Sequence, residues 1–256
     1  MSDEPGQPLR HPGRGRGLNL PVPAVALAIG AHPDDVEFGA GGTLAKWAAA
    51  GAVIHHVVCT DGSKGTWDVT ADTAGLVARR QDEQRAAAKA LGSRGEVVFL
   101  GWTDGELDSG LAQRAEVARW IRELRPDVVL GHDPWRRYRL HPDHRHAGLL
   151  ACEGIVAARD PHFFPEQGVP HHRPTHLLLW EADAPNHAED VTDSLEAKLA
   201  ALECHASQFE STMHASGPDE LEKLEAFRSR VRQRLGEQGR RVGVAHAETF
   251  TLIDRL

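Results

Sequence analysis

Residues 24–35 read AVALAIGAHPDD, a short apolar run that ends in a histidine, a proline and two aspartates. An unbroken apolar run of this length is typical of a strand that is buried on both faces of a parallel sheet. Polar residues directly after such a strand lie at the carboxyl edge of the sheet, where ligand sites form in α/β proteins. The stretch therefore indicates both a fold class and the position of a candidate site.

The rest of the chain alternates apolar strands with amphipathic helices. Further strands are predicted over residues 53–59, 96–100, 127–131, 175–180 and 248–253. Helices are predicted from residue 44 onward in LAKWAAAGA, over 78–91 and 111–124, after 141–143 and through 149–158, and over 195–205 and 219–235. Because strands that alternate with helices form mainly parallel sheets, we expect a Rossmann-like three-layer α/β fold with helices on both faces of the sheet.

One domain is expected over residues 19–256, because neither a repeat nor a linker interrupts the alternation in a chain of 256 residues. Residues 1–18 are rich in Gly, Pro and Arg and lack the apolar segment of a secretion signal, so they are expected to be a disordered leader. The apolar stretch over residues 20–30 is short and interrupted by proline, so we expect no membrane insertion.

Charge and cysteine content narrow the classes of partner. The net charge is −8 and the Lys and Arg residues are scattered, so no nucleic-acid partner is expected. Cys59, Cys152 and Cys204 lie far apart and in no CxxC pair, which favours neither a disulfide framework nor a cysteine zinc site. A reducing cytoplasm is therefore expected. The chain has 16 histidines, an unusual number, and a few of them are candidates for metal ligands.

The segment His32-Pro33-Asp34-Asp35 places two adjacent carboxylates beside a histidine. Like charges in contact raise each other's pKa, and a divalent metal ion removes that conflict. Pro33 and the turn after it break the alternation of an extended chain, so His32 and Asp35 can converge while Asp34 is free for a second task. Nitrogen and carboxylate ligands suit zinc, whose catalytic sites carry three protein ligands and an open position for water.

A third ligand is expected from another strand end. The segment His141-Pro142-Asp143-His144 follows the strand predicted to end near Gly131. Pro142 is well placed to open a helix, and His141 and His144 then lie on neighbouring faces of its first turn, within reach of one small site. Asp143 is a candidate for holding a histidine tautomer.

Each segment alone has an ordinary structural explanation. HPDD can be a turn with a capping aspartate, and a helix that opens with proline and aspartate is common. Their joint occurrence at two strand ends of one sheet favours a metal site. Two other kinds of site fit less well. The glycines of residues 39–42 (GAGG) lack the GxGxxG spacing of a dinucleotide loop, and neither the cysteines nor Ser63 lies in a nucleophile motif.

Two motifs carry a resemblance to a known family. Residues 31–37 (AHPDDVE) and 141–144 (HPDH) resemble the hallmark motifs of the PIG-L/LmbE-type N-acetylglucosaminyl deacetylases. Residues 80–83 (RQDE) and 100–105 (LGWTDG) are similar to supporting motifs of that family. The resemblance extends from about residue 24 to about residue 209.

The resemblance implies a zinc site, in which other divalent metals can replace zinc. It implies that His32, Asp35 and His144 bind the metal. It also implies that Asp34 acts as general base on the water that the metal activates.

Further roles follow from the same resemblance. His141 would stabilise the oxyanion or assist the departing amine, and Asp143 would orient His141. Arg80 and Asp104 occupy positions at which the family grips sugar hydroxyls.

One position departs from the family's pattern. Some members carry a tyrosine two residues before the first histidine of the second motif, where it helps to polarise the carbonyl. This chain has Arg139 at that position, and Tyr138 can substitute only if the loop differs.

The implied activity is hydrolysis of an N-acetyl or other N-acyl group on a small molecule that contains an amino sugar. Alternatives on the same scaffold are an amidase of thiol conjugates and a deacylase of a glycosylated antibiotic. A non-catalytic carbohydrate-binding or metal-binding protein is more remote, because a mere binder has no need of a free base such as Asp34. Substrate choice is expected to lie in residues 62–75, 135–140 and 160–174. Homo-oligomers occur in the family, although no sequence feature here sets a number.

Overall fold

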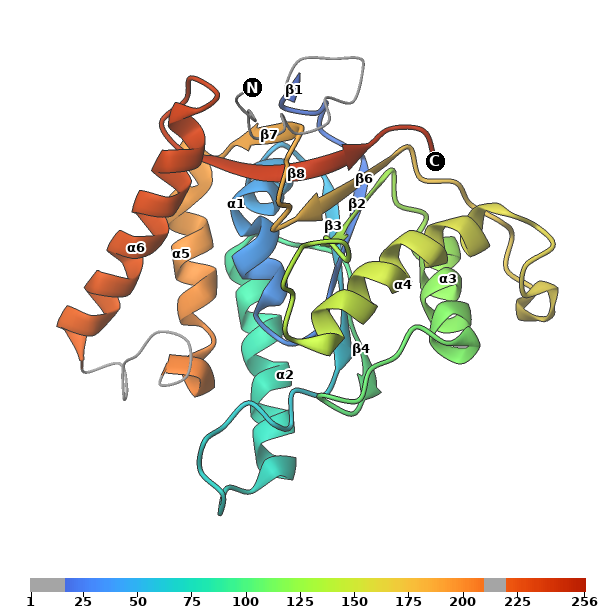
Figure 1. The fold of residues 1–256 in the computed structure, drawn as a ribbon, viewed down its shortest axis with the longest axis horizontal. Helices are drawn as coiled ribbons and strands as arrows, with labels where there is room; N and C mark the ends of the chain where they lie inside the picture. The colour runs from blue at the N-terminus through green and yellow to red at the C-terminus, as the bar shows by residue number, and fades with distance from the viewer. Residues whose placement is uncertain (1–16, 210–219) are drawn as a thin grey trace, which may run out of the picture.

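The computed structural model of the protein describes residues 17–209 and 220–256 and shows an α/β fold built on one sheet (Figure 1). The strands are β1 (Gly17–Leu18), β2 (Val25–Gly30), β3 (Val53–Thr60), β4 (Val97–Trp102), β5 (Val128–His132), β6 (His176–Trp180), β7 (His187–Asp190) and β8 (Ala247–Ile253). The helices are α1 (Asp35–Ala49), α2 (Thr73–Ala90), α3 (Leu111–Leu124), α4 (Pro142–Arg159), α5 (Leu195–Glu203) and α6 (Leu221–Arg240). Short 3₁₀ turns lie at Pro165–Gln167, Thr192–Ser194 and Ala206–Gln208.

The described strands form a sheet in the order β1-β7-β8-β6-β5-β2-β3-β4. The five strands from β6 to β4 in this order are parallel, whereas β8 runs antiparallel to both β6 and β7. The central strands β2 and β5 are buried along almost their whole length, as expected from their apolar runs. The prediction of a mainly parallel sheet is therefore confirmed.

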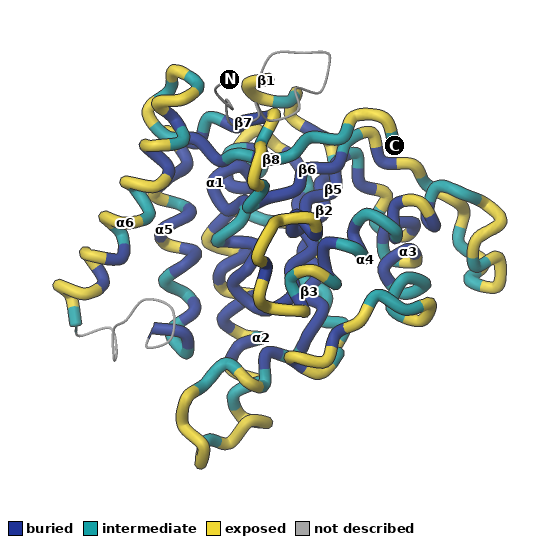
Figure 2. Tube along the Cα trace, viewed as in Figure 1, coloured by how far each residue is buried: buried dark blue, intermediate teal, exposed yellow. Residues whose placement is uncertain are grey.

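Helices cover both faces of this sheet. Helices α3 and α4 pack together on one face, and α1, α2 and α5 pack on the other, with α6 outermost against β8 (Figure 1). Alternate residues of β2 face the two layers: Leu27 and Ile29 join the core under α3 and α4, and Ala26 and Ala28 join the core under α1. Figure 2 shows the central strands β2 and β5 buried between the helices. The structure confirms the Rossmann-like three-layer fold.

Helix α1 begins at Asp35, whereas the apolar spacing predicts a helix only from residue 44. The glycines before residue 44 suggest a loop, but they lie inside the helix and permit close packing. A Cβ atom on Gly39 would overlap the Trp180 ring, and one on Gly42 would overlap Val191. The early start matters for the site, because it places Asp35 in the first helical turn, directly after the end of β2.

The other predicted helices differ from the structure mainly at their ends. Helix α3 has the predicted bounds, and Pro142 opens α4 as expected. Helix α6 extends to Arg240, five residues past its predicted end, and predicted residue 219 lies outside the described residues. Within residues 17–209 and 220–256, no helix combines the length and apolar character that crossing a membrane requires.

The edge strand β1 and its neighbour β7 carry no apolar signal in the sequence. Strand β7 reads HAED, and β1 consists of Gly17 and Leu18, which pair with His187 and Ala188 of β7. Backbone pairing rather than an apolar run holds these strands. Of the predicted leader over residues 1–18, residues 1–16 lie outside the described residues, and the last two residues belong to β1.

Candidate active site

A cavity of about 480 Å³ opens at the carboxyl edge of the sheet. Loops that follow β2, β3, β4 and β5 contribute to its walls, together with α2 and α6. The predicted site residues that line the cavity are His32, Asp34, Asp35, Arg80, Asp104, His141 and His144. Asp143 lies behind this wall, fully buried. The fold therefore collects the two motifs and the two supporting segments into one place.

The turn at the end of β2 holds Asp34 in a strained backbone conformation. Asp34 has a φ of 102°, a region that costs a residue other than glycine about 1–3 kcal/mol. Two side chains of α2 hold this turn. The backbone N–H of Asp34 donates to Oε1 of Gln84 (3.0 Å), and Arg80 donates to the carbonyl of Pro33 (2.7 Å). Helix α2 thus supports the conformation that separates Asp34 from Asp35.

Three side chains converge with the spacing of metal ligands. Nδ1 of His32 lies 3.4 Å from Oδ2 of Asp35, and Nε2 of His144 lies 3.3 Å from Oδ1 of Asp35. Ligand atoms held ~2.1 Å from a tetrahedral zinc ion lie roughly 3.4 Å from one another. Two imidazole nitrogens and a carboxylate also match the donor chemistry that zinc prefers. The residues therefore fit a His2Asp metal centre.

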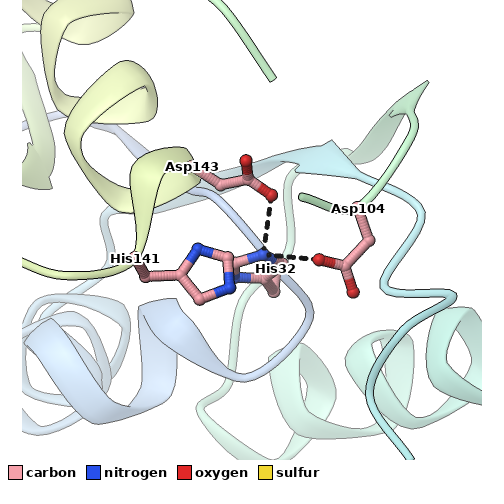
Figure 3. A group of neighbouring side chains, drawn as sticks. All are labelled: His32, Asp104, His141 and Asp143. Carbon is pink, nitrogen blue, oxygen red and sulfur yellow. Dashed lines mark hydrogen bonds and ion pairs between the residues drawn. The ribbon is translucent and has the colours of Figure 1, made fainter. Parts of the chain in front are cut away.

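The second ring nitrogen of His32 faces two carboxylates (Figure 3). Nε2 lies 3.1 Å from Oδ2 of Asp143 and 3.2 Å from Oδ1 of Asp104. Burial lowers the pKa of His32, but its contacts with Asp104, Asp143 and Asp35 outweigh burial and raise that pKa well above its usual value. A carboxylate on the far nitrogen favours the tautomer that leaves Nδ1 free for a metal ion.

Asp143 is bonded to His32 and to a neighbouring loop. Its carboxylate accepts hydrogen bonds from the backbone N–H of Gly105 (2.6 Å) and of Leu107 (3.3 Å). The resemblance assigns Asp143 to the orientation of His141, but the hydrogen bonds of Asp143 to the described residues run elsewhere. Asp143 therefore fixes a candidate metal ligand in place.

The two adjacent aspartates differ in their affinity for protons. Burial raises the pKa of Asp34 to about 6, and the Arg80 guanidinium opposes this effect. Burial acts in the same direction on Asp35, but His144 and His132 outweigh it and lower the pKa of Asp35 well below its usual value. Neighbouring carboxyl groups whose pKa values are driven apart take different roles. The lowered pKa keeps Asp35 ionised, the form that a metal ligand would need, and the pKa of about 6 lets Asp34 exchange a proton near neutral pH.

The two histidines of the second motif are neutral near pH 7. Burial lowers the pKa of His144 to about 4, against the effect of Asp35, and burial also lowers the pKa of His141. Their rings stack with centroids 4.9 Å apart, and the His141 ring lies 4.6 Å from that of His32. Neutral imidazole is the form that binds a metal or donates a single hydrogen bond.

His132, the last residue of β5, is a site residue that the sequence patterns missed. Its Nε2 lies 3.2 Å from Oδ2 of Asp35, and its ring stacks on His144 with centroids 4.4 Å apart. The indole N–H of Trp180 donates to Nδ1 of His132 (3.0 Å), and Nε2 faces Asp35. Burial lowers the pKa of His132, but its contacts with Asp35 and Glu181 outweigh burial and raise that pKa. A signal was available, because His132 directly follows a predicted strand, as His32 does.

Arg139, not Tyr138, reaches the site from the loop after β5. The Tyr138 side chain is 91% exposed, whereas Arg139 is buried and donates to Oε2 of Glu181 (2.6 Å). Burial raises the pKa of Glu181, but His132 and Arg139 outweigh it and lower that pKa to about 2. Arg139 also lies 3.3 Å from Nδ1 of His144. A guanidinium thus stands where some family members have a phenol, and Glu181 is a second residue that no motif signalled.

A buried polar network supports Asp34 from behind. Gln84, whose Oε1 accepts from the Asp34 backbone, donates through Nε2 to Oε1 of Glu37 (2.8 Å). The other oxygen of Glu37 lies 3.3 Å from Nε2 of His205, and all three side chains are buried. Because the Glu37 carboxylate accepts from the amide nitrogen of Gln84, the direction in which the Gln84 amide points is fixed. Glu37 belongs to the first motif, yet the motif alone did not show what it contacts.

Arg80 and Asp104 line the cavity while bonded to the protein. Arg80 donates to the carbonyl of Gly62 (2.9 Å), and Oδ2 of Asp104 accepts from the backbone N–H of Lys64 (3.0 Å). These bonds hold both side chains at the cavity wall. Their contact with substrate stays a prediction.

Fold and site together define a class of protein. It is an α/β protein of Rossmann-like topology, with a candidate His2Asp metal centre and a separate, protonatable carboxyl group at the carboxyl edge of its sheet.

Comparisons with known proteins identify the family within this class. A family model for PIG-L, described as GlcNAc-PI de-N-acetylase, matches residues 27–155. The diacetylchitobiose deacetylase of Thermococcus kodakarensis is 37% identical over 186 residues, which cover 72% of this chain and 69% of that protein. The 1D-myo-inositol 2-acetamido-2-deoxy-alpha-D-glucopyranoside deacetylase of Segniliparus rotundus is 32% identical, with coverage of 72% and 76%.

A solved structure agrees with these matches. The N,N'-diacetylchitobiose deacetylase from Pyrococcus horikoshii superposes with a TM-score of 0.80 at 32% identity, and the match covers 91% of this chain and 84% of that one. The chain belongs to the PIG-L family. The resemblance inferred from the HPDD and HPDH motifs is confirmed.

Proposed function

We propose that this protein is a zinc-dependent hydrolase that removes an acetyl group from the amino group of a small amino-sugar compound. The similar proteins support the reaction class, because their names describe deacetylases of N-acetylated sugars. The observation that carries the proposal is the set of His32, Asp35 and His144 at ligand spacing with Asp34 beside it. A binding protein would have no use for a carboxyl group tuned to exchange protons.

His32, Asp35 and His144 would hold the metal. A zinc ion bound there would polarise the amide carbonyl and lower the pKa of a water molecule. A His2Asp set also accepts iron, cobalt or manganese, so metal analysis must accompany the assays. His132 and Asp143 would keep the ligands in place, through Asp35 and His32 respectively.

Asp34 would accept the proton of the attacking water. Its Oδ2 lies 3.6 Å from Nη2 of Arg80, which favours the ionised form that a base requires. Burial opposes ionisation, and the resulting pKa of about 6 lets Asp34 both take a proton and return it to the leaving amine.

His141 would act on the substrate from the opposite motif. As a neutral side chain on the cavity wall, it would donate a hydrogen bond to the oxyanion that develops on the amide carbonyl. Arg80 and Asp104 would hold hydroxyl groups of the sugar next to the reacting amide.

The test is release of acetate by the purified protein. We expect acetate from N,N'-diacetylchitobiose or N-acetylglucosamine, loss of activity after chelation, and recovery when zinc is restored. Absence of acetate release from every N-acetylated sugar by fully metal-loaded protein would refute the proposal.

A wider substrate panel separates the remaining candidates. Preference for an acylated thiol conjugate or for a glycosylated antibiotic over simple amino sugars would favour those alternatives on the same scaffold. The cytoplasmic location expected from the cysteines and a homo-oligomeric state stay predictions, which fractionation and light scattering would check.

A further inference from the structure

A second cavity adjoins the candidate active site. It has a volume of about 440 Å³ and lies among α1, α5, α6, β8 and the loop that follows β6. Phe38, Glu181 and Arg234 line both cavities, so the two cavities share part of their walls. Each cavity has the size of a small-molecule site. A substrate that reacts at the metal centre can therefore extend into the second cavity.

Two acidic groups of this second cavity already have cationic partners. Glu181 accepts from Arg139 (2.6 Å) and lies 3.3 Å from Nη1 of Arg136. Asp183 accepts from the backbone N–H of Arg137 (2.7 Å), whose guanidinium lies 3.4 Å away. Neither carboxylate presents an unopposed negative charge to a ligand.

The third acidic group, Glu248, is buried and fully engaged. It accepts from Lys198 (2.6 Å), from the backbone N–H of Gly42 (2.9 Å) and of Thr43 (2.8 Å), and from the Thr43 hydroxyl (2.6 Å). Lys198 is in turn occupied by Glu248 and by the carbonyl of Phe38. The opposite charges of Lys198 and Glu248 cancel, so this ion pair adds no net charge to the cavity.

Arg234 is a cation on the wall of the second cavity. It lies exposed on α6, lines both cavities, and makes no hydrogen bond or ion pair to another residue of the described ranges 17–209 and 220–256. Arg230, one helical turn earlier, lines the same cavity. A guanidinium offers a planar fork of donors that matches the oxygens of a phosphate or a carboxylate.

We propose that the second cavity is a subsite for an anionic group, a phosphate or a carboxylate, carried by the substrate away from its acylated amino group, with Arg234 as the principal contact. This inference rests on the proposed deacetylase function and narrows its substrate class to acidic amino-sugar derivatives. None of the loops expected to select the substrate includes α6, so the sequence motifs did not indicate this subsite.

The test compares neutral and phosphorylated sugars on the zinc-loaded protein. The probes are N-acetylglucosamine, its 1-phosphate and its 6-phosphate, assayed for acetate release and for direct binding by titration calorimetry. Arg234→Gln removes the charge and keeps a helix-forming polar side chain. Arg240→Gln is the matched control, because Arg240 is exposed on the same helix and lines neither cavity.

We expect the wild-type protein to bind one of the two phosphates more tightly than N-acetylglucosamine. Arg234→Gln should weaken that binding and lower kcat/KM for the same phosphate by about tenfold, the effect of one charge-assisted hydrogen bond at an exposed position. Binding of N-acetylglucosamine to Arg234→Gln should fall much less than binding of that phosphate, and Arg240→Gln should behave as wild type.

The outcomes separate the subsite from the activity. Equal binding of both phosphates by wild type and Arg234→Gln, or an equal loss for neutral and charged sugars, would overturn the subsite. Acetate release without any preference for a phosphate would leave the deacetylase function standing and the subsite wrong. Phosphate-selective binding that depends on Arg234, without acetate release from any sugar, would support the subsite and refute the proposed reaction.

Discussion

Asp34 and Asp35 are neighbours in the chain that face different surroundings. The carboxylate of Asp35 lies within 3.2–3.4 Å of His32, His132 and His144, whereas Asp34 pairs with Arg80 at 3.6 Å. The turn at the positive φ of Asp34 directs the two side chains apart. Three imidazoles stabilise the charge of Asp35, and burial penalises the charge of Asp34, so one pKa falls and the other rises.

Asp34→Asn keeps the size of the side chain and removes its capacity to accept a proton. We expect acetate release to fall roughly 10²–10⁴-fold, the usual contribution of a general base, while the zinc content stays at one ion per chain as proposed for wild type. Turnover assays and metal analysis check both statements. Asp82→Asn, exposed on α2, is the control. Full turnover by Asp34→Asn would exclude it as the base.

Asp143→Asn tests how His32 is held. Because Asp143 lies 3.1 Å from Nε2 of His32, we expect zinc affinity to weaken roughly 10–100-fold, as for other outer partners of a metal ligand. Competition with a chelator measures the affinity, and Asp108→Asn in the exposed loop before α3 is the control. Unchanged affinity with reduced turnover would instead favour the role beside His141 that the family resemblance implies.

Helix α1 shows how glycine can mislead a prediction of local structure. Glycine lowers helix propensity, so GAGG before residue 44 suggests a loop, yet Gly39 and Gly42 lie in α1 because Trp180 and Val191 leave no room for a Cβ atom. Tertiary packing thus overrides local propensity here. By contrast, α3 has its apolar residues at helical spacing and no glycine inside, and its bounds follow from the sequence.

Two glycine substitutions should have opposite effects on stability. Gly39→Ala forces a methyl group into the Trp180 ring, so we expect the free energy of unfolding to fall by about 1–3 kcal/mol. Gly236→Ala in α6 should raise it by up to about 1 kcal/mol, because the nearest atoms lie 3.7 Å from the new Cβ and alanine favours the helix. Urea unfolding measures both values. A neutral Gly39→Ala would contradict the close packing of α1 on Trp180.

Glu248 links the last strand to elements from the first and last thirds of the chain. From β8 it accepts hydrogen bonds from Gly42 and Thr43 of α1 and from Lys198 of α5. The antiparallel strand β8 therefore holds α1 and α5 against the sheet, and with them the turn that carries Asp34. This arrangement ties the stability of the whole molecule to the geometry of the site.

Lys198→Met should destabilise the protein strongly. Lys198 is 2% exposed, and its loss leaves the buried charge of Glu248 without a cation, so we expect the free energy of unfolding to fall by roughly 3–5 kcal/mol. Adding Glu248→Gln should recover part of that loss. Lys223→Met, which removes the exposed pair with Glu220, should cost less than about 1 kcal/mol. Equal effects of the two lysine substitutions in denaturant unfolding would show that the buried pair is not what holds β8.

Apart from β1 and β7, the alternation of strands and helices along the chain could be read from the sequence alone, as could the two segments that carry the candidate ligands. Hydrophobic periodicity and short motifs reside in contiguous residues. The sequence alone therefore predicts a buried strand from AVALAIG and a candidate site from the HPDD and HPDH segments. Contacts between distant segments could not be read in this way. The approach of His132 to Asp35, the pairing of Asp143 with His32, and the cavity that Arg234 shares with the candidate metal ligands depend on strand order and helix packing. These distances are set by the packing of the whole molecule, because the conformation of each segment also depends on the burial and hydrogen bonding of the segments around it.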